Sequence, residues 1–255
     1  MTHRTDLWLF ISGLIASSVN AAAGGGTLLS FPSLLAAGLS PIAANATSTV
    51  GLVPGYFAAL VGYRLELKAL RGDAVRAIAP SVLGGALGAW LLLRLGGAVF
   101  ARIVPLLLLG SAALLLANRP ISRALAHRKI RFDSPLAVFA ATFTIAVYAG
   151  YFGAGAGILF LAAMGLLLKR DLGQINALKV LVSLISNVVA AATLAILELR
   201  HPTGALVFRA DLPLALGAMA GGYLGVSVVR RLPPAALRSF AAAVGFAIAI
   251  YLVVR

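Results

Sequence analysis

The stretch from Asn176 to Asn187, NALKVLVSLISN, places one lysine in an otherwise uncharged run. Its polar residues are Asn176, Lys179, Ser183 and Asn187, spaced by 3, 4 and 4 positions. A helix with 3.6 residues per turn stacks such residues on one side. An ionisable group in an apolar segment normally faces the interior of a helical bundle and pairs with a partner. The pattern therefore predicts a polar, positively charged face that lipid does not cover.

The sequence offers Lys179 no carboxylate at its own depth. The acidic residues all lie at or beyond the ends of apolar runs: Asp6, Glu66, Asp73, Asp133, Asp171, Glu198 and Asp211. Three interpretations of the lysine stay open. The amine reaches the near surface along its alkyl chain, it is neutral because burial disfavours the charge, or it pairs with an anion from solution. Ser183 and Asn187 taken alone are also typical of hydrogen bonds between membrane helices.

The composition indicates a membrane protein. Of 255 residues, 61% are hydrophobic, against roughly 45–50% in soluble domains, and the mean hydropathy is +1.02. Runs rich in Leu, Ala and Gly favour helices over a barrel. The net charge of +14 comes from connections between the runs, where membrane proteins collect Lys and Arg, so we expect no nucleic-acid partner. Without cysteine or a histidine inside the runs, we expect no metal, no cofactor and no catalytic residue.

We predict an all-α polytopic membrane protein made of two homologous halves. The apolar segments expected are 7–37, 42–63, 74–94 and 98–118, then 134–168, 174–197, 210–230 and 235–254. A shift of 131 positions places Gly24 on Gly155, Gly26 on Gly157 and Asn45 on Asn176. The predicted organisation is a first transmembrane repeat over 1–118, a basic cytoplasmic linker over 119–133 and a second repeat over 134–255. Such duplication is typical of secondary transporters.

The first segment of each half is too long for one crossing. Segment 7–37 would measure about 46 Å as a helix, against a hydrocarbon layer of ~30 Å. Breaks are predicted at the central glycines, which are Gly24, Gly25 and Gly26 in one half and Gly153, Gly155 and Gly157 in the other. Close packing between helices is the alternative role of such glycines. If the broken segments cross the membrane, the repeats are parallel; if they turn back, the repeats are inverted. The distribution of basic residues leaves this choice open.

Broken helices would bring free backbone N–H groups and positive helix ends to the polar faces of both halves. The first half carries its own, lighter polar face in ANATS. A lysine, amides and hydroxyls with no acid among them describe a site for a small anion. The candidate substrate-binding residues are Lys179, Asn176, Ser183, Asn187, Asn45, Thr47, Ser48, Gly24, Gly25, Gly26, Gly153, Gly155 and Gly157.

These stretches resemble the TauE/SafE family, the sulfite exporter and sulfonate permease group of bacterial membrane proteins. The resemblance covers nearly the whole chain and is carried by AGGGTLLSFPSLLAAGLSPIAANATS, GYFGAGAGILFLAAMGLL and NALKVLVSLISN. Ala22 stands where the family has its first glycine, and the second turn reads GAGAG in place of consecutive glycines. The resemblance implies multi-pass transport of small sulfur-containing or organic anions, across the bacterial inner membrane.

We therefore expect a secondary transporter, an exporter of small anions such as sulfite or organosulfonates, in the cell inner membrane. Its expected partners are the anion and the lipid bilayer, and a homo-oligomer is compatible with the sequence. An anion channel would share the positive site but needs no closed state. A transporter of a carboxylate without sulfur is a further alternative. The residue types within the apolar runs disfavour an enzyme.

Overall fold

The computed structural model describes residues 3–22, 24–126, 134–228 and 234–254. This part of the chain is helical and contains no strand, as the composition predicts. Its helices are α1 (His3–Ala22), α2 (Thr27–Ala36), α3 (Pro41–Gly51), α4 (Val53–Gly62), α5 (Arg64–Ala69), α6 (Arg71–Ala126), α7 (Pro135–Tyr151), α8 (Ala156–Leu167), α9 (Leu172–Arg200), α10 (Phe208–Val228) and α11 (Pro234–Val254). Helix α6 continues into the segment predicted as a linker, and residues 127–133 of that segment lie outside the described residues.

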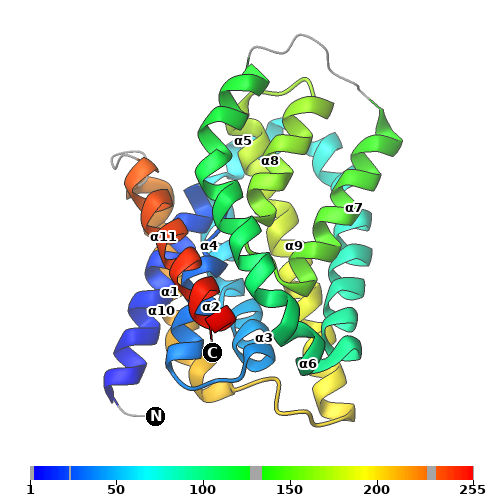
Figure 1. Ribbon diagram of the computed structural model, residues 1–255. Coiled ribbons are helices and arrows are strands. Elements are labelled where there is room, and N and C mark those ends of the chain that lie inside the picture. The colour runs from blue at the N-terminus through cyan, green and yellow to red at the C-terminus, as the bar shows by residue number, and fades with distance from the viewer. Residues whose placement is uncertain (1–2, 23, 127–133, 229–233, 255) are drawn as a thin grey trace.

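Two helical hairpins enter the molecule from opposite ends (Figure 1). Helix α1 runs inward from the lower end and α2 returns to it, whereas α7 runs inward from the upper end and α8 returns there. Each inward helix is followed by a glycine in the left-handed region, Gly24 with φ 71° and Gly153 with φ 81°. The N–H of each glycine donates to a carbonyl five residues back, on Val19 and Tyr148. Such glycine-ended helices are common because only glycine adopts this conformation without strain.

The segment predicted at 42–63 is two helices, α3 and α4, separated at Leu52. Pro54 has no N–H to donate to the carbonyl of Val50, so the regular helical hydrogen bonds are interrupted there. Ser40 caps the start of α3 by accepting a hydrogen bond from the N–H of Ala43. Because of this interruption, α3 and α4 pack against different sets of helices.

Helix α6 contains the two segments predicted at 74–94 and 98–118. Only Gly96 departs from helical geometry, with φ 78° and ψ 169°. Figure 1 shows one part of α6 running down and the other returning upward. The chain therefore reverses direction at one glycine, in the gap that the sequence predicted between segments 74–94 and 98–118.

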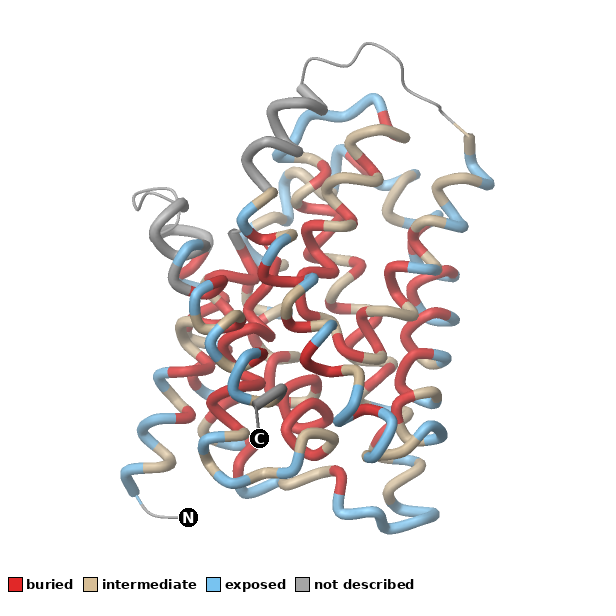
Figure 2. The backbone as a smooth tube through the Cα atoms, in the orientation of Figure 1, coloured by how far each residue is buried: buried red, intermediate tan, exposed pale blue. Residues whose placement is uncertain are grey.

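The interior is packed by close backbone approaches. Helices α1 and α10 meet along their lengths, and a Cβ atom on Gly225 would lie 2.8 Å from the Cα of Ser18. Figure 2 shows buried residues concentrated in the middle of the bundle. Large apolar side chains remain exposed on the outside, among them Leu65, Leu106, Leu136, Leu199, Phe208 and Tyr223.

Such an apolar exterior suits contact with lipid. Within the described residues, Arg71–Ala117 and Leu172–Arg200 are long and apolar enough to cross a membrane. The first of these includes the reversal at Gly96.

Candidate functional site

The tips of the two hairpins meet through glycines. A Cβ atom added to Gly24 would lie 2.7 Å from the Cα of Gly157, and one added to Gly157 would lie 2.8 Å from the Cα of Gly24. Real Cβ atoms essentially never approach this closely. The two glycine clusters, which the sequence predicted to lie in separate broken segments, are therefore in backbone contact inside the bundle.

Lys179 lies beside this contact, on α9, and is only 1% exposed. Its Nζ donates to the carbonyl of Asn20 at 2.9 Å and to that of Ala21 at 3.5 Å. These carbonyls belong to the C-terminal end of α1, which carries roughly half a negative charge. The surface-reaching interpretation of Lys179 is wrong, because the amine is directed into the bundle. The counter-group that the structure provides is a helix end, which the sequence analysis did not consider.

Two neighbours complete this cap on α1. Asn176 Nδ2 donates to the hydroxyl of Tyr63 at 2.7 Å and to the carbonyl of Ala21 at 3.3 Å. The Tyr63 hydroxyl donates to the same carbonyl at 3.2 Å. Asn176 and Lys179 thus lie together as predicted from their spacing, while Tyr63 was not a candidate because it lies at the end of an apolar segment in the other half.

Asn20 is a second residue that the sequence analysis missed. Its Oδ1 accepts hydrogen bonds from the N–H groups of Gly25 at 3.0 Å and Gly26 at 2.6 Å. Its Nδ2 donates to the hydroxyl of Tyr56 at 3.0 Å. The amides at the first glycine cluster, which were predicted to be free for a ligand, are therefore already bonded. The available signal was a single asparagine in an apolar run, four residues before the glycines.

The tip of the second hairpin is held differently. Asn45 Nδ2 donates to the carbonyl of Tyr151, at the end of α7, at 2.8 Å. The hydroxyls of Ser111 and Tyr148 donate to the carbonyl of Ala154 at 2.7 and 2.6 Å. Helix α8 then begins after Gly155, which is left-handed and provides no side-chain cap.

The uncapped start of α8 lies beside the lysine. A Cβ atom on Gly157, in the first turn of α8, would lie 3.0 Å from Cδ of Lys179. The N-terminus of a helix attracts anions, and the Lys179 amine close by adds a positive charge when it is protonated.

The other polar residues predicted to bind substrate make hydrogen bonds elsewhere in the bundle. Ser48 shares a hydrogen bond of 2.6 Å with Ser30 of α2, and the Thr47 hydroxyl accepts from the N–H of Val207 at 3.3 Å. Asn187 Nδ2 donates to the carbonyl of Ser183 in its own helix at 2.8 Å. These hydrogen bonds therefore place Thr47, Ser183 and Asn187 outside the network that surrounds the end of α1.

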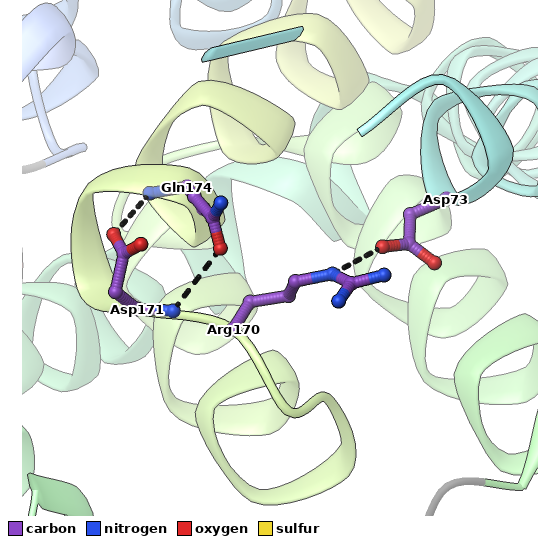
Figure 3. A network of polar contacts seen from close by, with 4 residues as sticks. All are labelled: Asp73, Arg170, Asp171 and Gln174. Carbon is purple, nitrogen blue, oxygen red and sulfur yellow. Dashed lines mark hydrogen bonds and ion pairs between the residues drawn. The ribbon is translucent and has the colours of Figure 1, made fainter. Parts of the chain in front are cut away.

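A cavity of about 220 Å³ opens between the ends of α6, α7, α8 and α9. It is mainly apolar and is lined by Asp73, Arg76, Ala77, Pro135, Val138, Phe139, Thr142, Phe160, Met164, Leu168 and Leu178. Arg170 Nε donates to the Asp73 carboxylate at 2.8 Å, and this ion pair joins the connection between α8 and α9 to α6 (Figure 3). The adjacent capping box of Asp171 and Gln174 fixes the start of α9.

Broken helices that meet inside an apolar helical bundle, with an ionisable side chain at the meeting point, are typical of membrane transporters. The family model described as "Sulfite exporter TauE/SafE" matches residues 9–252. The chain belongs to this family, and the resemblance noted in the sequence is confirmed. It is a membrane transporter by family.

Curated relatives carry the same general description. A "Probable membrane transporter protein" of Haemophilus influenzae is 28% identical over 222 residues, which cover 87% of this chain and 84% of the relative. "Probable membrane transporter protein YfcA" of Escherichia coli is 28% identical over 180 residues, or 71% of this chain and 66% of the relative. "Probable membrane transporter protein ORF9" of Sinorhizobium sp is 26% identical over 220 residues, or 86% and 80%. No solved structure matches the chain.

Proposed function

We propose that the protein is a secondary transporter that exports a small anion, such as sulfite or an organosulfonate, across the bacterial inner membrane. The observation that carries the proposal is the buried Lys179 beside the uncapped start of α8. The N–H groups of Ala156 and Ile158 already donate to the carbonyls of Gly153 and Gly155. An oxyanion there would therefore be attracted mainly by the positive end of the helix dipole and by the nearby ammonium group. The family's description as sulfite exporters supports sulfur oxyanions as the first substrates to test.

The hydrogen bonds of Lys179 suggest how binding moves the protein. In the structure the ammonium ties α9, in the second half, to the carbonyl end of α1, in the first half. An anion at the start of α8 competes with these carbonyls for the ammonium. Binding therefore loosens the connection between the halves, and release of the anion restores it.

The arrangement of helices supports inverted repeats in a multi-pass membrane protein. The first hairpin opens toward the end where α1 begins, and the second opens toward the end where α7 begins (Figure 1). Arg64, Lys68, Arg71, Lys169 and Arg170 lie at this second end or in the connections that reach it. Because cytoplasmic loops collect basic residues, we assign this end to the cytoplasm and the start of α1 to the outside.

The test is counterflow of labelled sulfite into proteoliposomes that contain unlabelled sulfite. Wild-type protein should show saturable uptake that internal sulfite accelerates, a behaviour that distinguishes a carrier from a channel. Lys179→Gln should lower the uptake rate at least tenfold, whereas Lys68→Gln, at an exposed lysine, should leave it unchanged. Uptake by Lys179→Gln at the wild-type rate would overturn the proposed site.

Because Lys179 also caps α1, loss of activity needs a second readout. Sulfite should raise the melting temperature of the wild type and of Lys68→Gln, and leave that of Lys179→Gln unchanged. If Lys179→Gln melts lower but gains the same increment from sulfite, the lysine has only a structural role.

A further inference from the structure

Asp211 is a buried carboxyl that neither the sequence analysis nor the proposed binding site uses. It lies in the first turn of α10 and is 6% exposed. Neither carboxylate oxygen has a hydrogen-bond partner among the residues that the structure describes. Its position at the edge of segment 210–230 indicated a carboxyl at the membrane boundary, and the sequence carries no signal that α3 covers it.

The carboxyl faces the end of α3. A Cβ atom on Gly51 would lie 3.4 Å from Asp211 Oδ1 and would clash with the side chain of Leu214. The carbonyl end of α3 is slightly negative, and Pro54 withholds one of the N–H groups that would satisfy it. An ionised carboxylate is therefore poorly placed here, whereas a protonated one has a hydrogen to donate to a carbonyl.

The helices α3 and α4, which pack against α10, bring no charged residue to Asp211. Helices α3 and α4 contain no Asp, Glu, Lys, Arg or His, and Tyr56 is their only titratable side chain. The charged or titratable residues at this end of the bundle are His3, Arg4 and Asp6 on α1, Glu198 at the end of α9, His201 after it, and Arg209 on α10. Glu198 accepts hydrogen bonds from Thr203 and Gly204, and the two carboxylate oxygens of Asp211 have no hydrogen-bond partner among the described residues.

Helix α3 connects this carboxyl to the hairpins. Thr47 of α3 accepts from Val207, just before α10. Asn45, half a turn earlier, holds the end of α7. A change in the contact between α3 and α10 is therefore transmitted to the second hairpin through one short helix.

We propose that Asp211 binds and releases a proton in each transport cycle and so couples anion movement to the proton gradient. The step is a proton transfer between the carboxyl group and water, with no other bond made or broken. In its protonated form the carboxyl keeps the position beside Gly51 of α3 that the structure gives it. Loss of the proton leaves an unpaired charge that separates α3 from α10 and admits water. This inference rests on the proposed transport of an anion.

The test uses proteoliposomes that contain a pH-sensitive dye, with methanesulfonate as the anion because it does not titrate near neutral pH. A methanesulfonate gradient should move protons with the wild type and with Asp6→Asn, a half-buried carboxyl at the same end of the bundle. Asp211→Asn, which mimics the protonated state, should abolish proton movement and keep methanesulfonate counterflow within threefold of wild type. Proton movement by Asp211→Asn at the wild-type rate would overturn the inference.

A binding-independent readout separates this inference from the proposed function. In detergent, the melting temperature of the wild type should fall as the pH is raised from 5 to 9, because a buried group that is favoured in its protonated form loses stability as it ionises. Asp211→Asn should lose most of this dependence, and Asp6→Asn should keep it. If the wild type shows no counterflow, the proposed transport is rejected, but the pH dependence of the melting temperature still tests whether Asp211 titrates. If Asp211→Asn does not fold, Asp211→Glu should shift the midpoint of the dependence, and an unshifted midpoint contradicts the role.

Discussion

Asn45 and Asn176 each donate a hydrogen bond to the broken helix of the opposite half. Asn45 Nδ2 reaches the carbonyl of Tyr151 at the end of α7, and Asn176 Nδ2 reaches that of Ala21 at the end of α1. The two asparagines are the pair that the 131-residue shift aligns. Their equivalence was predicted from sequence as a shared ligand face, and the structure uses both amides to satisfy helix ends.

This relationship makes a prediction for Asn45, which is fully buried. Asn45→Leu should destabilise the protein by about 1–3 kcal/mol, because the carbonyl of Tyr151 loses its donor. Asn45→Asp should be worse at neutral pH, since a carboxylate would face that carbonyl, and should recover in acid, where the protonated group donates again. Thermal melting in detergent between pH 5 and 8 measures both effects.

Thr144→Val is the matched control for Asn45. Thr144 is exposed, and its described hydrogen bond is to Ala140 in its own helix, so Thr144→Val should change the free energy of unfolding by no more than about 0.5 kcal/mol. An Asn45→Asp protein whose melting temperature ignores pH would contradict the assigned hydrogen bond.

Because Gly24 and Gly157 are in contact, we expect that adding a methyl group to either residue destabilises the protein. Gly157→Ala should lower stability by about 1–3 kcal/mol through overpacking, and Gly24→Ala should cost more because its positive φ adds strain. Gly110→Ala, with open space around the site, should be neutral or slightly stabilising. Melting temperatures of the three variants decide the matter, and equal values for Gly157→Ala and Gly110→Ala would show that the tips do not touch.

The ion pair between Asp73 and Arg170 should be weak. Its side chains are 11% and 41% exposed, and pairs of this kind contribute about 0.2–1 kcal/mol. A double-mutant cycle with Asp73→Ala and Arg170→Ala should give a coupling in that range, and high salt should reduce it. A coupling that is large and insensitive to salt would mean that the pair is enclosed when the protein is in its membrane.

Several features follow directly from the sequence. The apolar runs and their Gly-rich centres predict a helical membrane protein, and the 3, 4, 4 spacing places Asn176 and Lys179 on one side of α9. The apolar runs and the polar spacing are local patterns, so they can be recognised in a single sequence. The family motif adds the transporter class.

The partners of these residues were not predictable in the same way. Tyr63 and Asn20 contact the site from segments far away in the chain, and no periodicity links them to Lys179. Carbonyl groups carry no sequence signature, so a helix end did not enter the list of counter-groups. Asp211 lies at a segment edge as expected, but its burial was not predictable, because the distance from a segment edge says nothing about which helix covers the side chain.

The cap on α1 has a consequence for biosynthesis. Asn176 is 155 residues beyond Ala21, and ribosomes add roughly 5–20 residues per second. The carbonyl end of α1 is therefore made about 8–30 seconds before the side chains of Asn176 and Lys179 that cap it exist. During this interval the nascent chain needs a temporary donor, from water, lipid headgroups or the insertion machinery, until the second half arrives to replace it.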